Sequence, residues 1–359
     1  MTSVTAFRIF KQVPRLLFGR GSLERVGELL PPKKSKDEHY VFVVDDVHRG
    51  GPVGERILFE GADLVEWFPA SKKEPSTAQV DALRDRVVES GKGRLPVAIV
   101  GIGGGSTMDV AKALSVMLCN DGSSAQYQGW DLVPTPGIYK MGIPTVSGSG
   151  AEASRTAVLM GRDRKFGINS DYSMFDSIIL DSTLIAGVPT QQRFYSGMDC
   201  YIHCVESIQG TMINELARGY AGTALELCER VFLGDGDDDM LMTASYLGGV
   251  SIVNSEVGVC HALSYGLSME LGYRHGMANC VAFKVLDEYY GAAVDRFRAM
   301  LRRHNIAVPE NVCVDLDAAA MDRMVKMTLR MEKPLINALG ADWKILLTPD
   351  KIVELYNRM

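Results

Sequence analysis

Residues 96–109 read PVAIVGIGGGSTMD, an apolar run that leads directly into a cluster of glycines. A short continuous apolar run of this kind is typical of a strand buried on both faces of a sheet. Residues 107–118 then repeat apolar side chains at the spacing of a helix. The segment therefore predicts a buried strand, a tight glycine turn and a helix.

The alternation of strand and helix extends to both sides of this segment. Residues 40–44 (YVFVV) predict an earlier buried strand, residues 77–89 predict a helix, and residues 178–181 predict the last strand of the sheet. Buried strands separated by helices indicate an α/β fold with a parallel sheet covered on both faces.

The second half of the chain has a different sequence pattern. From residue 193 onward, strand patterns are scarce and segments rich in Ala, Leu, Met and Glu follow one another. Since 359 residues exceed what one compact core usually holds, we expect two domains. They are an α/β domain over residues 1–185 and an all-helical domain over residues 186–359.

Composition and charge exclude several classes of protein. Lys and Arg number 38 and Asp and Glu 44, so the net charge of −6 favours no nucleic-acid partner. The N-terminal residues lack the apolar core of a signal peptide. The apolar stretch 241–271 contains Asn254 and Glu256, which predicts one buried helix and no membrane span. Seven cysteines without a C-x-x-C pair indicate reduced thiols in a cytoplasmic protein.

The glycine cluster at residues 103–105 predicts an anion site. Glycines let the backbone approach a ligand closely, and free N–H groups at the start of the next helix attract phosphate. We interpret the ligand as the diphosphate of a dinucleotide, with Ser106 and Thr107 offering hydroxyl groups. Asp45, at the end of the earlier strand, would bind the ribose hydroxyls and disfavour a 2′-phosphate. A tight turn without any ligand is the alternative.

A second polar loop, PTVSGSGAE at residues 144–152, follows another apolar run. Its small hydroxyl side chains suit contacts with a cofactor. Taken by itself, an ordinary Gly/Ser loop explains this segment equally well.

Acidic and imidazole side chains in the helical half predict a metal site. Asp199 and His203 are four residues apart, so a helix places both on one face. His261 and His275 could meet the same ion only if the chain turns between them, and Gly266 and Gly272 are the expected break points. One carboxylate and three imidazoles suit Fe(II), Zn(II), Co(II), Ni(II) or Mn(II).

Other interpretations of these residues remain open from the pattern alone. Each histidine taken singly is an ordinary core or surface residue, and we place His39, His48 and His304 in surface segments. The rival ligands are thiols, which we prefer as small buried residues: Cys200, Cys204 and Cys260.

Taken together and in this order, the segments resemble the iron-containing, or group III, metal-dependent alcohol dehydrogenases. FGRG at 18–21 resembles the opening hairpin signal of that family, and GIGGGSTMDVAKA at 101–113 resembles its diphosphate loop. PTVSGSGAE and ILDSTL match further family segments. GMDCYIHCVES at 197–207, with GVCHALSYGL and HGMAN farther on, resembles the metal segments.

The resemblance implies a dehydroquinate synthase-like fold and a specific set of functional residues. It makes Asp199, His203, His261 and His275 the ligands of an iron or zinc ion. It also places a set of residues around the dinucleotide, which we expect to be NAD rather than NADP because of the Asp45 carboxylate: Asp45, Gly103, Gly104, Gly105, Ser106, Asp109, Thr145, Ser147 and Lys165.

The sequence departs from the family pattern at one position that matters for chemistry. Many members carry a second histidine four residues after the first, where this chain has Tyr265. We therefore predict that Tyr265 or a chain of water molecules carries the substrate proton.

The closest subgroup by resemblance oxidises the terminal hydroxyl of 3-deoxy-D-manno-octulosonate, an acidic sugar of lipopolysaccharide. Arg274 and Arg193 are the candidates to bind its carboxylate.

The resulting expectation is a metal-dependent enzyme, a homodimer as relatives commonly are, that moves a hydride between an alcohol or polyol and NAD. Two other functions stay open. One is a lyase or cyclase that resembles dehydroquinate synthase and uses NAD transiently, and the other is a non-catalytic nucleotide- or sugar-binding protein.

Overall fold

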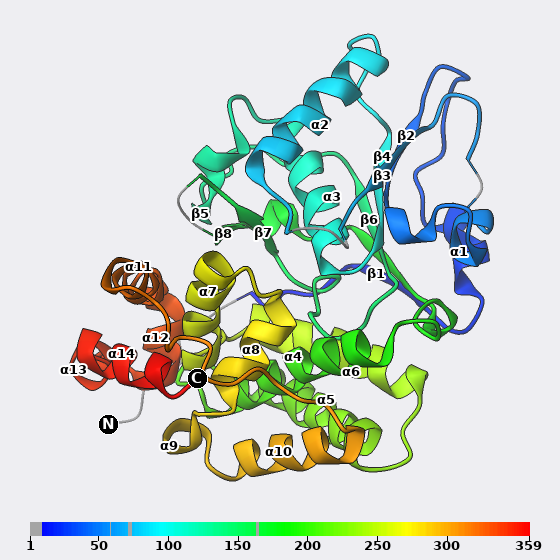
Figure 1. Cartoon of the computed structure of the whole chain (residues 1–359). Helices are drawn as coiled ribbons and strands as arrows, with labels where there is room; N and C mark the ends of the chain where they lie inside the picture. Colours follow the sequence, from blue (N-terminus) through cyan, green and yellow to red (C-terminus); the bar gives the residue numbers. More distant parts are fainter. Residues whose placement is uncertain (1–8, 58, 71–73, 163–164) are drawn as a thin grey trace.

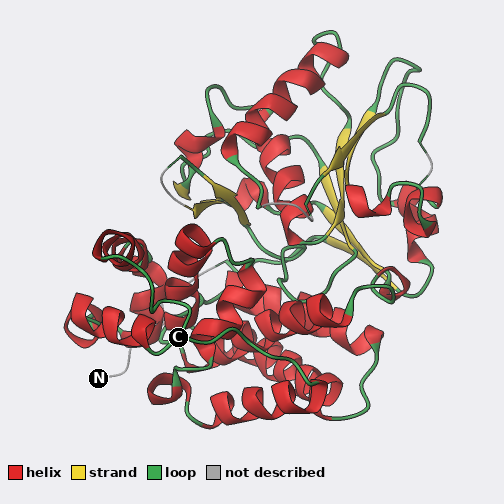
Figure 2. Ribbon diagram, viewed as in Figure 1, coloured by secondary structure: helices red, strands yellow, loops and turns green. Residues whose placement is uncertain are grey.

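The computed structural model describes residues 9–57, 59–70, 74–162 and 165–359. It shows an α/β half and a helical half that lie against each other (Figure 1). In Figure 2 the strands are confined to the first of these halves. From residue 186 to the C-terminus, all of which is described, the chain forms helices and loops without a strand.

The main sheet has six strands in the order β1-β9-β6-β4-β2-β3, and every neighbouring pair is parallel. Its strands are β1 (Arg15–Phe18), β2 (Tyr40–Asp45), β3 (Leu64–Phe68), β4 (Ala98–Gly103), β6 (Lys140–Pro144) and β9 (Ser177–Leu180). The predicted parallel sheet is thus confirmed, and β9 is its last strand in the sequence.

Two features of the α/β half differ from the sequence prediction. Residues 18–21 form no hairpin, because β1 pairs in parallel with β9 and a short 3-10 segment follows it. A second sheet of three strands contains an antiparallel pair, β7 with β8. Its strands are β5 (Gly129–Trp130), β7 (Thr156–Met160) and β8 (Lys165–Asn169).

Apolar side chains bury both faces of the main sheet. On one face, α2 (Thr77–Ser90) and α3 (Gly105–Met117) cover Val41, Val43 and Ile99. On the other face, Phe42, Val44 and residues of the first 3-10 segment pack near α1 (Pro52–Glu55). This burial on both faces explains why the strands are continuously apolar.

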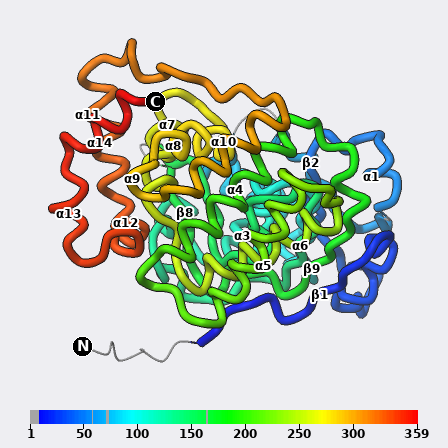
Figure 3. Tube along the Cα trace, turned by 90° about the horizontal axis from the view of Figure 1, so that it is seen from below, coloured from blue at the N-terminus to red at the C-terminus, as the bar shows by residue number. Residues whose placement is uncertain are grey.

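The helical half begins at Thr190, after the last strand has ended at Leu180. Its helices are α4 (Thr190–Gln209), α5 (Glu215–Leu233), α6 (Asp238–Val253), α7 (Val259–Leu271), α8 (His275–Phe283), α9 (Asp287–Tyr290), α10 (Ala292–His304), α11 (Ala318–Leu329), α12 (Glu332–Leu339), α13 (Trp343–Leu346) and α14 (Pro349–Asn357). Seen from below, α11 to α14 lie at the side of the molecule opposite to α1 and β1 (Figure 3).

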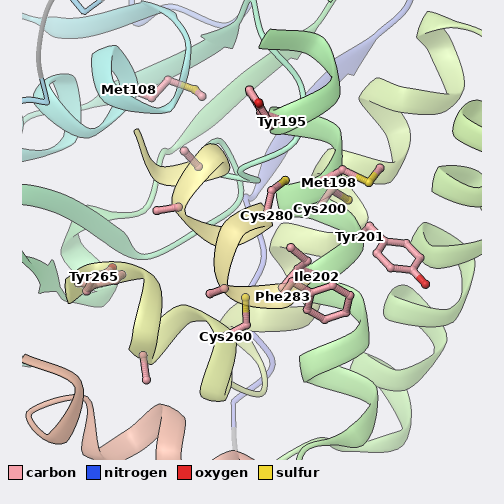
Figure 4. Packing of buried hydrophobic residues seen from close by; sticks show 14 of the residues in the cluster. Met108, Tyr195, Met198, Cys200, Tyr201, Ile202, Cys260, Tyr265, Cys280 and Phe283 are labelled. Atoms are coloured by element: carbon pink, nitrogen blue, oxygen red, sulfur yellow. The ribbon is translucent and has the colours of Figure 1, made fainter. Parts of the chain in front are cut away.

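The core of the helical half joins α4, α7 and α8. Figure 4 shows Met198 and Ile202 of α4, Cys260 of α7 and Phe283 of α8 packed together. The buried cluster to which they belong extends without a break to residues of α3. The division of the chain after residue 185 therefore stays a prediction, although the change from strands to helices falls there.

The apolar stretch 241–271 is not the single helix that the sequence predicts. It divides into α6 and α7, with a loop over residues 254–258. No helix among the described residues is long and apolar enough to span a membrane. All seven cysteines are free, as expected from the absence of C-x-x-C pairs.

Candidate active site and metal centre

A large cavity lies between the carboxyl ends of the main strands and the helical half. Its volume is about 1810 Å³, and residues from both halves line it. A drug-sized ligand typically occupies a pocket of roughly 300–1,000 Å³. The cavity therefore has room for a dinucleotide together with a small substrate.

Four side chains of the helical half converge on one wall of this cavity. The Nε2 atoms of His261, His203 and His275 lie 3.3, 3.5 and 3.6 Å from Oδ1 of Asp199. One ligand atom from each of the four lies within 4.8 Å of all the others. This is the distance range in which a single cation would contact every one of them.

Three helices bring these side chains together. Asp199 and His203 occupy consecutive turns of α4, as the spacing predicts. His261 lies in the first turn of α7 and His275 begins α8. The chain reverses at Gly272, whose φ of 70° is in the left-handed region that favours glycine. The other expected break point, Gly266, stays inside α7.

Two residues that the sequence pattern did not reveal hold this cluster in place. Glu206 accepts a hydrogen bond from Nδ1 of His261 at 2.5 Å, and Asn279 lies 2.6 Å from Oδ1 of Asp199 through its Nδ2. Glu206 lies three residues after His203 on α4, and Asn279 lies four residues after His275 on α8. This helical spacing is the signal that could have found both.

The electrostatics of the cluster fit a divalent cation. Burial raises the pKa of Asp199, but His203, His275 and His261 lower it below its usual value. Burial lowers the pKa of His275 to about 4 despite the opposing charge of Asp199, so that imidazole is neutral at neutral pH. Burial also lowers the pKa of His261, yet Glu206 and Asp199 raise it to about 9. A bound cation would replace the proton that His261 carries at this pKa, and one carboxylate with three neutral imidazoles is a donor set suited to iron or zinc.

The glycine cluster forms the opposite wall of the cavity. Gly104 precedes the first turn of α3, and Gly104, Gly105 and Ser106 line the cavity. Gly103 is not among the lining residues. A Cβ atom there would lie 2.6 Å from the side chain of Thr107, so Gly103 lets the strand pack closely on the helix. The free N–H groups at the start of α3 make the anion site that the sequence predicts.

Further predicted cofactor residues lie along the same wall. Asp45 ends β2 and lines the cavity, where burial raises its pKa. Asp109 also lines the cavity and accepts a hydrogen bond from the Val158 N–H at 3.0 Å. Burial raises the pKa of Asp109 to about 6, although Lys112 opposes this.

The second polar loop reaches the cavity at Thr145. Its hydroxyl lies 2.9 Å from Nε2 of His48, a residue for which the sequence predicts a surface segment. His48 instead lines the cavity, and burial lowers its pKa. Ser147 is buried but is not among the lining residues. His39 is likewise buried, contrary to the sequence prediction.

Lys165 and Tyr265 lie between the two walls. Lys165 is 1% exposed and its Nζ is 3.3 Å from Oε1 of Glu74, which also accepts a hydrogen bond from the backbone N–H of His275. Glu74 thus links the α/β half to α8. The Tyr265 ring lies edge-on to His275 with centroids 6.1 Å apart. Burial raises the pKa of Tyr265, so its hydroxyl is neutral at neutral pH.

The cysteines considered as alternative metal ligands lie outside the metal cluster. Cys200 lies 3.5 Å from the sulfur of Cys228 in the apolar core, and none of the three rival thiols belongs to the four-residue cluster.

Arg193 forms an ion pair with Asp238 and is not among the cavity-lining residues, so the prediction that it meets a substrate carboxylate is wrong. Arg274 does line the cavity, and its charge opposes the rise that burial causes in the pKa of Asp45.

Comparison with known families agrees with this arrangement. Residues 14–182 match the family model of the iron-containing alcohol dehydrogenases, and residues 193–334 match the C-terminal model of the same family. The chain therefore belongs to the iron-containing alcohol dehydrogenase family, and it is an oxidoreductase.

Individual relatives lie at moderate distance. A sulfoacetaldehyde reductase of Bilophila wadsworthia is 30% identical over 292 residues, which cover 76% of this chain and 73% of that protein. Long-chain-alcohol dehydrogenase 1 of Geobacillus thermodenitrificans is 32% identical over 51% of this chain, but the match spans only 49% of its own length.

Solved structures share the fold along nearly the whole chain. The sulfoacetaldehyde reductase of Bifidobacterium kashiwanohense, solved in complex with NAD+, has a TM-score of 0.78 at 20% identity and covers 98% of both chains. A 1,3-propanediol oxidoreductase has a TM-score of 0.79 at 20% identity, over 97% of this chain and 99% of that one. These likenesses establish the dehydroquinate synthase-like fold.

Proposed function

We propose that the protein moves a hydride between the carbinol carbon of a small alcohol and NAD at a divalent metal site. The observation that carries the proposal is a convergence of four side chains within 4.8 Å on one wall of the cavity: Asp199, His203, His261 and His275. The glycine turn lines the opposite wall of the same cavity. Iron and zinc are the metals that this donor set favours.

The reaction removes a hydride and a proton from the alcohol. The carbinol C–H bond breaks with its electron pair, and the hydride forms a bond to C4 of the nicotinamide. The hydroxyl proton leaves to solvent, so the products are a carbonyl compound, NADH and H⁺. A bound divalent metal supplies Lewis acidity, which lowers the pKa of the substrate hydroxyl.

The remaining residues have positioning roles in this proposal. Asp45 would bind the ribose hydroxyls, and the N–H groups at Gly104, Gly105 and Ser106 would bind the diphosphate. Thr145, Asp109 and Lys165 line the cavity and would contact the rest of the dinucleotide, whereas Gly103 and Ser147, which are not among the lining residues, would support it from behind. Tyr265, neutral and beside His275, would pass the substrate proton to water through its hydroxyl.

The finer predictions from the sequence belong to the same proposal. They are an acidic sugar such as 3-deoxy-D-manno-octulosonate as substrate, a cytoplasmic location, a homodimer, and a division of the chain after residue 185. Arg274 supports an acidic ligand because it lines the cavity beside His275.

The deciding experiment compares metal-depleted protein with protein reloaded with Fe(II) or Zn(II). Reloaded enzyme should reduce NAD with an alcohol, measured as NADH absorbance, and the Asp199→Ala and His275→Ala variants should lose this turnover while NAD binding by calorimetry persists. Full turnover in chelated enzyme would exclude the proposal. Transient NADH without net accumulation would instead indicate a lyase or cyclase.

A further inference from the structure

Besides the four metal-binding side chains, the cavity lining includes several charged groups. Residues 254–257, in the loop immediately before the helix that carries His261, belong to this part of the lining. The start of α12 contributes Lys333, and Trp130 of β5 comes from the α/β half.

Two of the cations in this part of the lining already have carboxylate partners. Arg155 forms ion pairs with Asp131 and with Asp171, the latter at 2.7 Å. Lys11 lies 2.5 Å from Asp171. Because these charges are balanced within the protein, they leave little for a ligand to neutralise.

Glu256 and Lys333 differ from them. Nζ of Lys333 lies 3.8 Å from the centroid of the Trp130 ring, and neither Lys333 nor Glu256 forms an ion pair within the described part of the chain. The Glu256 carboxylate accepts a hydrogen bond from the N–H of Val257 at 3.1 Å. Both side chains line the cavity, so each has polar atoms available to a ligand.

The elements that carry the two groups lie together, because Asn337, four residues after Lys333 on α12, donates hydrogen bonds to the backbone oxygens of Glu256 and Val257 at 2.8 and 3.0 Å. Burial raises the pKa of Glu256 to about 7, against the opposing charges of Lys333 and His261. Burial lowers the pKa of Lys333, and Glu256 is the largest influence that opposes this. A carboxyl and an ammonium group are thus electrostatically coupled without direct contact. The loop that carries Glu256 lies beside the metal site, because a Cβ atom at Gly258 would lie 3.0 Å from Oε1 of Glu206, the residue that holds His261.

We propose that Glu256 and Lys333 form a subsite that selects a polyhydroxylated substrate over a simple alkanol. The carboxylate of Glu256 accepts hydrogen bonds from substrate hydroxyls, and Lys333 donates to their oxygens. An alkyl chain would displace water from both groups and leave them without partners, which is costly in a buried site. Sites built to hydrogen-bond a hydroxyl can reject the analogue without it by up to roughly 10⁴–10⁵-fold. This inference rests on the proposed alcohol oxidation.

The test uses substrates of equal carbon number, butan-1-ol and erythritol, with metal-loaded enzyme and NAD. The wild type should favour erythritol by at least ~100-fold in kcat/KM. In Glu256→Gln and in Lys333→Met the ratio of the two kcat/KM values should fall at least ~10-fold, mainly through the KM for erythritol. A wild type without preference for erythritol, or variants with an unchanged ratio, would overturn the subsite.

Matched controls separate this effect from a general loss of structure. Lys344 also lies over a tryptophan, with Nζ 5.3 Å from the Trp343 ring, but outside the cavity. Lys344→Met should keep the wild-type ratio, and so should Glu354→Gln, which changes an exposed side chain of α14. Metal content and the Kd for NAD should be equal in all variants.

A binding measurement tests the subsite independently of the proposed reaction. If no alcohol reduces NAD, the proposed function fails, and calorimetry of erythritol with NAD-loaded holoenzyme still decides the subsite. Binding that weakens in Lys333→Met and Glu256→Gln would support it. An absence of binding, or equal binding by variants and wild type, would overturn it.

Discussion

Nδ1 of His261 lies 2.5 Å from Oε2 of Glu206, and both side chains are almost fully buried. The other carboxylate oxygen of Glu206 accepts hydrogen bonds from the Cys260 N–H and the Tyr290 hydroxyl, both at 2.7 Å. With Nδ1 committed in this way, Nε2 of His261 is the nitrogen that faces Asp199. Glu206 therefore sets the orientation of one metal-binding imidazole.

We expect Glu206→Gln to weaken metal binding by about 10–100-fold, because the amide donates where the carboxylate accepts. Competition with a chelator of known affinity measures this directly. Tyr290→Phe is the matched control, since it removes the hydroxyl that donates to Glu206 and accepts from the Val259 N–H but keeps the carboxylate, and its loss should be smaller. Equal metal affinity in wild type and Glu206→Gln would show that the contact is dispensable.

Asp45→Asn should shift the preference between NAD and NADP. The variant loses the carboxylate that would accept ribose hydroxyls and repel a 2′-phosphate. We expect the Kd for NAD to rise about 10-fold and the Kd for NADP to stay equal or fall, since each lost charged hydrogen bond is worth about 1.5–3 kcal/mol at most. Asp46→Asn, a neighbour outside the cavity lining, should leave both constants unchanged.

Glu152 should make the stability of the protein depend on pH. Burial raises its pKa from 4.5 to about 7, against the hydrogen bond from the Ser245 hydroxyl. The unfolded chain loses this proton near pH 4.5 while the folded protein keeps it, so the stabilisation is complete below pH 4.5 and is lost as the pH rises to about 7.

The expected size of this effect is about 3 kcal/mol, from about 1.4 kcal/mol for each unit of pKa. Thermal unfolding of wild type and Glu152→Gln between pH 4.5 and about 8 measures it. The variant should lose that part of the pH dependence. Parallel curves for the two proteins would contradict the assignment.

Gly148→Ala should destabilise the contact between the two halves. Gly148 has a φ of 149°, and a Cβ atom there would lie 1.7 Å from the backbone oxygen of Ser196 in α4. We expect a loss of at least ~2 kcal/mol, because the backbone and not a flexible side chain must move.

Gly222→Ala in α5 is the matched control, since a methyl group at that position would have nothing within 4 Å and helical glycines gain about 0.5–1 kcal/mol from this change. Denaturation midpoints of both variants should therefore move in opposite directions. A stable Gly148→Ala protein would mean that the loop can shift away from α4.

Sequence reasoning succeeded where one local pattern carries the information. The apolar run before the glycine cluster predicted β4 and α3, and the i, i+4 spacing of Asp199 and His203 placed both on one helix face. It failed where the pattern was ambiguous, since Gly258 directly precedes the helix after the dividing loop whereas Gly248, Gly249 and Gly266 lie inside helices of the same apolar stretch, 241–271. His48 gave no local signal for its place in the cavity.

The sequence by itself determined the parallel sheet, the glycine turn and the helical second half. Burial on both faces of a sheet and helical periodicity each produce a pattern of apolar residues that can be recognised within a short segment of sequence. Only the tertiary structure decided that His261 and His275 meet Asp199, that Glu206 orients His261, and that the loop of Glu256 packs against the helix of Lys333. These relations join residues from separate elements of the helical half. Their distances follow from how the helices pack around a shared core, which no spacing along the chain specifies.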